Sequence, residues 1–343
     1  MANLVDVDVA VGERFLIEAL DRAADVAPAA VDAARRELDD SLAATRRSAL
    51  GELAWSASAL TPSRFPVEIA VTSASPELRT TVEVVAPEDD KAAALGRAIE
   101  LAEQFGAVGL VASHRLAMER HQRALVLRFG AWLSSRHNAG STRHKLYAEV
   151  AADRSDAWAL VDRLAPAARR VLGGVGPVRF LGMPLDGSAG IEVYVRPPTL
   201  DPFLLAAVLG RAGLRHGAER LNAAMSGTAE QSDRGFDGPN HGVSVSIGDD
   251  GNVVAVAAFT FAHHRWGRDH RVRRRILELA TAEVWPSADL YARLSAPLAV
   301  ATPLIRPYHV ALSEVMSTAR DAVEHHVSLA PMPSNPPPRT GDS

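Results

Sequence analysis

Short segments in which apolar and polar residues alternate recur along the chain, separated by segments with apolar residues at every third or fourth position. Alternation with a period of two is typical of β-strands with one buried face, and the longer spacing is typical of amphipathic helices. The alternating segments come in consecutive pairs, and GDDGN at 248–252 indicates a hairpin turn within one of them. The five predicted pairs are Phe65–Thr72 with Leu78–Val85, Leu125–Leu133 with Lys145–Val150, Val178–Pro184 with Ile191–Arg196, Val243–Ile247 with Val253–Phe261, and His309–Val315 with Glu324–Leu329.

The residues before and between these strand pairs have the apolar spacing of helices. The pattern as a whole predicts that the chain has three parts. Residues 1–59 form an N-terminal helical segment that we expect to pack on a strand-rich domain at 60–330, and the proline-rich, polar residues 331–343 predict a disordered tail. The Gly/Ser/Asp-rich stretch at 224–242 predicts a mobile loop. The predicted helices are Arg14–Ala24, Ala29–Leu53, Asp89–Phe105, Ser155–Val171, Asp201–Leu214 and Asp269–Val284.

Alternation also assigns side chains to the two faces of each strand, because successive residues point in opposite directions. In the strand at 191–196, Glu192, Tyr194 and Arg196 share one face and only apolar residues occupy the other. Two architectures fit this pattern. An open antiparallel sheet would turn its polar face to solvent. A closed ten-stranded barrel would pack its apolar face on a ring of helices and enclose a polar lumen large enough for a ligand.

Composition narrows the classes of function. The 343 residues are 47% hydrophobic and 23% charged with a net charge of −4, which predicts a globular protein without the basic field that nucleic acids or membranes require. Cysteine is absent, which excludes disulfides and thiolate metal sites. The longest apolar run is far shorter than the roughly 20 residues of a membrane helix, and the N-terminus lacks a signal-peptide pattern. We therefore expect a cytoplasmic protein with no metal site.

Two motifs then suggest a family. The segment LTPSRFPVEIAVTSASPELRTTVEVV at 60–85 contains a Pro-x-Glu in one predicted strand and a Leu-Arg and a Val-Glu in the next. It resembles the start of the catalytic region of aromatic prenyltransferases of the dimethylallyltryptophan synthase type. The Lys-x-Tyr at 145–147 is similar to the one that this family carries in its fourth strand. The resemblance implies an α+β fold, the ABBA barrel, in which ten antiparallel strands lie inside a ring of helices.

The resemblance also implies roles for individual residues. Glu68 matches the carboxylate that holds the acceptor N–H and assists proton removal, while Arg79 and Lys145 match cations that bind the prenyl diphosphate. Tyr147 matches a tyrosine that shields the allylic cation, and Tyr194 lies where the sixth strand would supply another. The remaining candidates are Arg196 as a further diphosphate ligand, and Phe259, Phe261 and His326 as parts of the chamber wall.

The expected function is therefore transfer of a prenyl group, such as dimethylallyl, from its diphosphate to an indole-like or other electron-rich aromatic acceptor, including an amino acid or peptide. Arginine and lysine can stabilise the charge on a leaving diphosphate, and aromatic faces can stabilise the carbocation that remains. The chain has no aspartate-rich DDxxD motif, which fits transfer without a metal or any other cofactor, the prenyl diphosphate being a co-substrate.

One departure from the family supports an alternative function. The family's sixth strand usually has a basic residue two positions before its tyrosine, and here that residue is Glu192. Its carboxylate would repel a diphosphate unless it pairs with Arg196 or is protonated. The chain also has only 4 tyrosines. The alternative is a barrel with altered or lost catalysis that binds a ligand or partner in a biosynthetic pathway.

Overall fold

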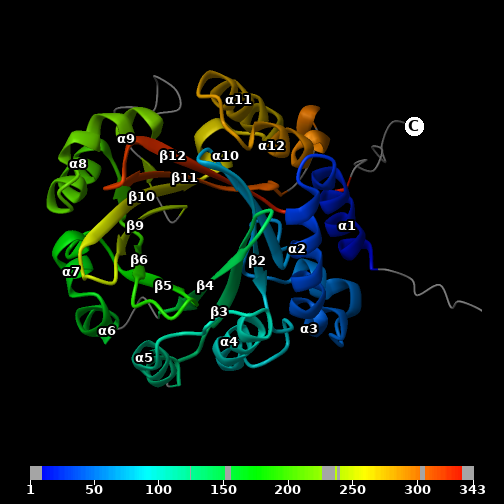
Figure 1. The fold of residues 1–343 in the computed structure, drawn as a ribbon, viewed down its shortest axis with the longest axis horizontal. Helices are drawn as coiled ribbons and strands as arrows, with labels where there is room; N and C mark the ends of the chain where they lie inside the picture. The colour runs from blue at the N-terminus through cyan, green and yellow to red at the C-terminus, as the bar shows by residue number, and fades with distance from the viewer. Residues whose placement is uncertain are drawn as a thin grey trace, which may run out of the picture.

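Ten antiparallel strands form a closed barrel surrounded by helices, as the computed structural model shows (Figure 1). The structure describes residues 10–123, 125–150, 156–225, 236–237, 240–301 and 306–333. Around the barrel the strand order is β1-β12-β11-β10-β9-β6-β5-β4-β3-β2. The strands are β1 (Val67–Thr72), β2 (Ser75–Glu83), β3 (Ala131–His137), β4 (Thr142–Glu149), β5 (Val178–Pro184), β6 (Ile191–Val195), β9 (His241–Ile247), β10 (Val253–Phe261), β11 (His309–Ser317) and β12 (Arg320–Leu329).

Closure of the barrel depends on pairing between its first and last strands. Ile69 of β1 lies opposite Leu329 of β12, and Thr72 lies opposite His326. This pairing leaves no free strand edge in the main sheet. The closed barrel is therefore confirmed, and the open antiparallel sheet is wrong.

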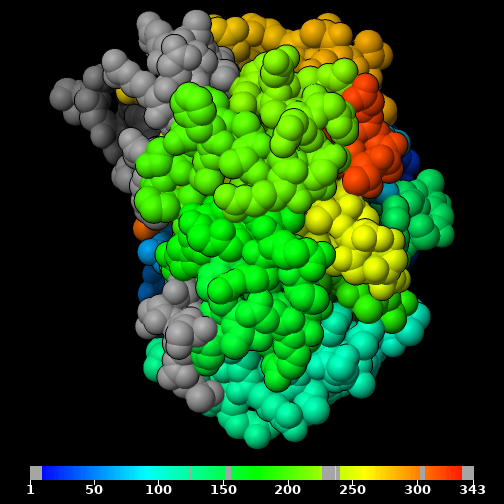
Figure 2. Space-filling view, turned by 90° about the vertical axis from the view of Figure 1, so that its left-hand side faces the viewer, coloured from blue at the N-terminus to red at the C-terminus, as the bar shows by residue number. Residues whose placement is uncertain are grey.

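The helices cover the outside of the barrel, and Figure 2 shows those between residues 156 and 225 forming a continuous layer on one side. The α-helices are α1 (Val11–Ala24), α2 (Pro28–Ser41), α3 (Ala43–Arg46), α4 (Ala94–Gln104), α5 (Ala112–Gln122), α6 (Asp156–Leu164), α7 (Pro166–Leu172), α8 (Pro202–Arg211), α9 (Ala218–Met225), α10 (Ala262–Trp266), α11 (Asp269–Ala282) and α12 (Ala288–Leu294). Short 3₁₀ helices lie at Gly51–Ser56, Lys91–Ala93, Arg215–Gly217 and Ala296–Ala299, and β7 (Thr199–Leu200) pairs with β8 (Phe236–Asp237) outside the barrel.

Alternation along the strands positions the interior of the barrel. In β6, the apolar residues Ile191, Val193 and Val195 are 3%, 0% and 0% exposed and pack in the hydrophobic layer between strands and helices. Glu192 and Tyr194, on the other face, project inward. Because burying the apolar face against helices removes it from water, this pattern fixes which side chains reach the lumen.

The N-terminal helices pack on one side of the barrel. Helix α2 contacts β2 and β3, and α1 contacts both α2 and α12 (Figure 1). At the other end of the chain Met332 is 2% exposed and belongs to the core, so packing extends past residue 330. Residues 334–343 of the predicted tail and most of the predicted loop at 224–242 lie outside the described residues. Within the described part of the chain, no helix is long and apolar enough to cross a membrane.

The third strand differs from the sequence prediction, because it begins at Ala131 rather than at residue 125. The preceding loop is held by Glu149, whose carboxylate accepts hydrogen bonds from the backbone N–H groups of Arg128, Phe129 and Gly130 at 2.7–3.1 Å. Gly130 has φ 71° and no room for a Cβ, which would lie 1.9 Å from the Lys91 carbonyl oxygen. These local contacts override the strand pattern of the apolar residues.

Candidate functional site

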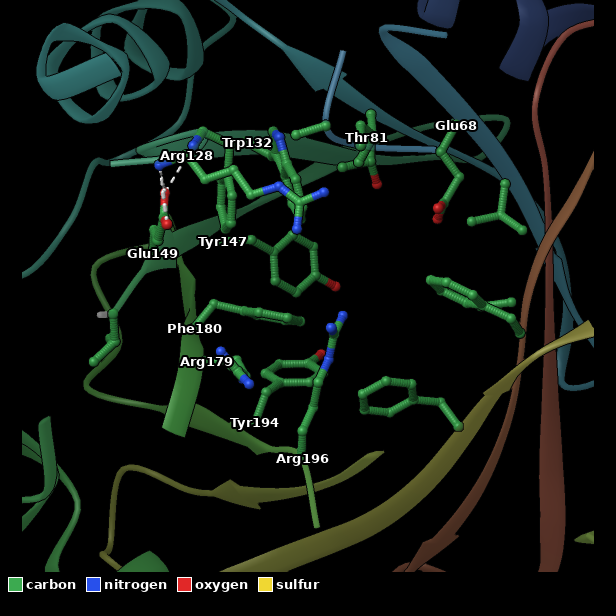
Figure 3. Close-up of a pocket in the computed structure, with 18 of the residues that line it drawn as sticks. Glu68, Thr81, Arg128, Trp132, Tyr147, Glu149, Arg179, Phe180, Tyr194 and Arg196 are labelled. Atoms are coloured by element: carbon green, nitrogen blue, oxygen red, sulfur yellow. Dashed lines mark hydrogen bonds between the residues drawn. The ribbon is translucent and has the colours of Figure 1, made fainter. Parts of the chain in front are cut away.

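A cavity of about 730 Å³ lies inside the barrel (Figure 3). Side chains from most strands and from the loops at one end of the barrel line this cavity. The lining residue Val126 is fully exposed, which indicates that the cavity opens to solvent at this end. Its size suits one or two small organic molecules. The lining residues are Ala59, Leu60, Glu68, Thr81, Val126, Arg128, Phe129, Trp132, Tyr147, Glu149, Val150, Pro177, Arg179, Phe180, Tyr194, Arg196, Asn240, Phe259, Phe261, Val310, Ala311 and Ser313.

Glu68 contributes a carboxyl group to the wall of this cavity (Figure 3). It projects from β1, where its neighbours Val67 and Ile69 are buried toward the helices. Burial raises the pKa of Glu68 to about 7, and a hydrogen bond with Ser328 offsets only part of this effect. A carboxyl group with such a pKa is present in both protonation states at neutral pH and can accept or donate a proton.

Aromatic side chains form one wall of the cavity (Figure 3). The rings of Phe180 and Tyr194 stack with centroids 4.2 Å apart, and the Tyr147 ring meets both edge-on at 6.0 and 5.8 Å. Phe259 extends this wall from β10, 6.1 Å from Tyr194. Tyr147, Tyr194 and Phe259 were candidates from the sequence and line the cavity, as does Phe261.

Lys145, a predicted diphosphate ligand, is not among the residues that line the cavity, and it is paired with Glu192 beside the aromatic wall, 5.1 Å from the centroid of the Tyr147 ring. Its ammonium group forms a short ion pair with the Glu192 carboxylate, which also accepts a hydrogen bond of 2.5 Å from Ser244. Pairing with Arg196 or protonation was the condition under which Glu192 would not repel a diphosphate, and the structure pairs it with Lys145 instead. Burial opposes both charges, but their attraction prevails, raising the pKa of Lys145 and lowering that of Glu192. Both groups are therefore charged at neutral pH.

The ion pair between Lys145 and Glu192 is possible because the residue between them on β5, Gly182, has no side chain. Lys145 and Glu192 lie on β4 and β6, and β5 runs between them. Gly182 of β5 lies opposite Tyr147 on one side and Glu192 on the other. A Cβ at Gly182 would lie 2.5 Å from the Lys145 Cε, so any larger residue would displace the lysine. Glycine at 182 thus lets the lysine reach over β5 to the carboxylate.

Arg79 and His326 form a second polar group that does not line the cavity. An Arg79 Nη is 3.3 Å from His326 Nδ1, and the other Nη is 3.8 Å from Glu77 and 3.7 Å from Glu324. Burial lowers the pKa of Arg79 to about 10, so it remains charged at neutral pH. Burial and the Arg79 charge lower the pKa of His326 to about 4, so this ring is neutral. The predicted diphosphate ligand Arg79 is thus already flanked by carboxylates.

Three arginines lie at the open end of the cavity instead. Arg128 is exposed, Arg179 and Arg196 are half-buried, and all three line the cavity (Figure 3). Burial, and then the neighbouring charges of Arg179 and Arg128, lower the pKa of Arg196, which shows that the three cations lie close together. Arg196 was a candidate from the sequence, whereas Arg128 and Arg179 were not.

The local backbone explains why Arg179 was missed. A bulge between Val178 and Phe180 shifts the register of β5 against β6. Arg179 and Phe180 are adjacent in sequence, yet both line the cavity, which strict alternation does not allow. Arg128 lies in the loop held by Glu149. The alternation of side chains that assigns faces in a strand does not apply to a loop, so it could not predict where Arg128 points. The only available signal was that both arginines lie within predicted strands, at 125–133 and 178–184.

Among the described ranges, no group of three or more histidine, aspartate or glutamate side chains is placed to hold a metal ion. No family model matches the chain, and no curated protein sequence matches it. Solved structures do. PriB, crystallised as a ternary complex with L-tryptophan and dimethylallyl thiolodiphosphate, shares 18% sequence identity with a TM-score of 0.76 over 97% of this chain and 99% of that chain.

Two further solved structures agree with this likeness. A 5-dimethylallyl tryptophan synthase from Streptomyces coelicolor has a TM-score of 0.77 at 16% identity, covering 98% of this chain and 99% of that one. A 6-dimethylallyltryptophan synthase from Micromonospora olivasterospora has a TM-score of 0.74 at 19% identity, covering 95% and 99%. The chain therefore has the ABBA barrel fold of these prenyltransferases over nearly its whole length.

Proposed function

We propose that the protein transfers a prenyl group, such as dimethylallyl, from its diphosphate to an indole-like aromatic acceptor inside the barrel, without a metal ion. The observation that carries this proposal is the cavity itself, which combines a titratable carboxyl group, an aromatic wall and a cluster of cations. The fold adds support, because solved structures with this fold contain tryptophan and a dimethylallyl diphosphate analogue.

Each part of the cavity has a role in this reaction. The allylic C–O bond breaks and both electrons leave with the diphosphate, whose charge arginine side chains stabilise. The allylic cation then lies against the faces of Tyr147, Phe180 and Tyr194, which stabilise it and exclude water. A carbon atom of the acceptor ring forms the new C–C bond, and the Glu68 carboxylate accepts the proton that this carbon loses.

The positive charge of the arginines replaces the charge that a metal ion would supply. Arg196 lines the cavity with a guanidinium group that can bind two phosphate oxygens at once. Arg79 and Lys145, the other predicted diphosphate ligands, have carboxylate partners in this structure. We therefore assign Arg196, and not Arg79 or Lys145, to contact with the leaving group.

The pairing of Lys145 with Glu192 favours a second candidate function. A cation already neutralised by a carboxylate cannot help ionise an allylic diphosphate. The chamber would then bind an aromatic ligand and act as a binding or partner protein in a biosynthetic pathway. This candidate shares the cavity with the first but predicts no turnover.

One experiment separates the two functions. The protein is incubated in EDTA with dimethylallyl diphosphate and a panel of indoles that includes tryptophan, and prenylated products are detected by mass spectrometry. Transfer predicts a product whose formation falls at least 100-fold in Glu68→Gln while binding of a non-ionisable donor analogue is unchanged. Tight binding of an indole by a folded protein that makes no product would support the binding function instead.

A further inference from the structure

Ser328 of β12 is a neighbour of Glu68 on the inward face of the barrel. Strands β1 and β12 are antiparallel, and Ala70 lies directly opposite Ser328. Glu68, two residues before Ala70, is on the same face of β1 and diagonal to Ser328, a position from which side chains on paired strands can meet. Ser328 is 6% exposed, and its hydroxyl group forms a hydrogen bond with the Glu68 carboxyl group.

A bulge in β11 holds the oxygen atom of this hydroxyl group. Between two regular pairs of β11 with β12, Val310 and Ala311 both lie opposite Ser328. The backbone N–H of Ala311 donates to Ser328 Oγ at 3.1 Å, and Ser328 Oγ can donate to the Ala311 carbonyl oxygen at 3.4 Å. The oxygen atom is therefore fixed, while its single hydrogen has two acceptors, the Ala311 carbonyl oxygen and the Glu68 carboxylate.

The other hydroxyl group next to Glu68 is engaged elsewhere. Thr81 of β2 lies opposite Glu68, but its hydroxyl group donates to Ser134 at 3.1 Å. Among the described residues, Glu68 has no ion-pair partner, and the hydrogen bond with Ser328 is the polar interaction that favours its ionised form. Ser328 is therefore the residue placed to control how the Glu68 carboxylate is held.

Two titratable side chains share the inward face of β12 with Ser328, and neither changes its charge above pH 5. Burial and the Arg79 charge lower the pKa of His326 to about 4, so this ring is neutral. Burial raises the pKa of Glu324, but the hydrogen bond with His326 and nearby positive charges outweigh this effect and lower it to about 2. The arginines that line the cavity also stay charged.

We propose that Ser328 is a positioning residue for prenyl transfer, whose hydroxyl group donates to the ionised Glu68 carboxylate and turns to the Ala311 carbonyl oxygen once Glu68 has accepted the proton. This inference rests on the proposed function and specifies how its base is held. The hydrogen bond occupies one carboxylate oxygen and leaves the other for the proton of the acceptor ring. A C–H bond of the acceptor breaks and the Glu68 O–H bond forms, while Ser328 keeps its own proton.

The first measurement needs no turnover. Urea unfolding of Ser328→Ala and of Ser328→Ala/Glu68→Gln, at half-unit steps from pH 5 to 9, isolates the titration of Glu68 in a protein without the hydroxyl group. In the wild-type background the difference between the two curves stops changing at about pH 7. Without the hydroxyl group this end point should lie about one pH unit higher. A loss of packing alone changes stability equally at every pH and leaves the end point in place.

The second measurement is the pH dependence of kcat for transfer in EDTA. Its rise should move by the same unit in Ser328→Ala, so that the rate falls about fivefold at pH 7 and recovers at pH 9. Ser328→Thr keeps a hydroxyl group and should restore both end points. The matched control is Thr81→Val, which removes the neighbouring hydroxyl group and should leave the unfolding end point at about pH 7. Near-ultraviolet circular dichroism checks that each variant is folded.

The outcomes separate this inference from the proposed function. An unfolding end point that stays at about pH 7 in Ser328→Ala, with a wild type that forms product, would overturn the inference and leave the proposed function standing. Equal shifts in Ser328→Ala and Thr81→Val would also overturn it, because the effect would then not depend on the Ser328 hydroxyl group. A wild type that forms no product would refute the proposed function, and the unfolding end points would still decide whether Ser328 donates to Glu68.

Discussion

The buried carboxyl group of Glu68 should make the free energy of unfolding fall as the pH rises from 4.5 to 7. The isosteric substitution Glu68→Gln should remove this pH dependence. Glutamine in Glu68→Gln has the shape of the protonated acid but does not titrate. Burial in the folded protein raises the pKa of Glu68 to about 7, above its ordinary value of 4.5. The unfolded chain therefore loses this proton at a lower pH than the folded protein does.

The sign and size of the effect follow from this difference. Below pH 4.5 both states are protonated, and the contribution of Glu68 to stability is complete. As the pH rises from 4.5 to 7 the unfolded state ionises first and gains stability relative to the folded state. Each pKa unit corresponds to about 1.4 kcal/mol, so the total loss is about 3 kcal/mol, and it ends above pH 7.

Urea unfolding of wild type and Glu68→Gln at half-unit steps from pH 4.5 to 8.5 measures this loss. The free energy of unfolding of the variant, minus that of the wild type, should rise by about 3 kcal/mol up to pH 7 and then stay constant. The subtraction cancels the titration of every other group that the two proteins share.

The control is Glu88→Gln, at an exposed carboxylate with the opposite behaviour. Hydrogen bonds from its own backbone and from the Ser48 hydroxyl lower the pKa of Glu88, so its contribution to stability is present at neutral pH and lost as the pH falls. Because this loss falls below the measured range, the difference curve of this variant should stay nearly flat from pH 4.5 to 8.5. A difference between wild type and Glu68→Gln that stays constant from pH 4.5 to 7 would refute the burial argument.

Four further outcomes follow from the site. The rate of transfer should rise with pH through about 7, because only ionised Glu68 accepts the ring proton, and a flat profile from pH 5.5 to 8 would contradict this role. In thermal or urea unfolding, Lys145→Met should destabilise the fold by about 3–5 kcal/mol, because it leaves the buried Glu192 carboxylate unpaired. The double variant Lys145→Met/Glu192→Leu should regain most of this lost stability, and a double variant as unstable as Lys145→Met would show that the two residues are not coupled. Tyr194→Leu should increase hydrolysis of the donor relative to transfer, measured as released diphosphate against prenylated product, and an unchanged ratio would exclude Tyr194 from shielding the cation. Removing divalent ions with EDTA should leave the rate of transfer unchanged, and recovery only on adding Mg²⁺ would refute metal-free transfer.

Much of the barrel could be predicted because its strands bury one face only. The period of two is visible in β6, where Ile191, Val193 and Val195 alternate with Glu192 and Tyr194. The pattern left closure of the barrel undecided, because closure depends on the pairing of Ile69 with Leu329, which is 260 residues later in the chain. Local periodicity carries no information about such a contact.

The charges of the site were harder to predict than its walls. The inner face of each strand was readable, but which cation meets which carboxylate depends on neighbours across strands. Lys145 reaches Glu192 only because Gly182 leaves space above the strand between them. Arg179 reaches the cavity only because a bulge breaks the alternation of β5. Both features are three-dimensional, so the sequence could not place the free cations.

The pairing of β1 with β12 has a consequence for how the protein is made. During synthesis β1 emerges well before its partner β12, because Ile69 pairs with Leu329, 260 residues later in the chain. Until then β1 has an unpaired edge that can join other chains, a hazard for any strand that waits for a distant partner. Contacts between distant segments also slow folding. The nascent barrel therefore depends on protection of β1 until β12 has been synthesised. Truncation before β12 should yield an aggregating chain rather than a smaller stable protein.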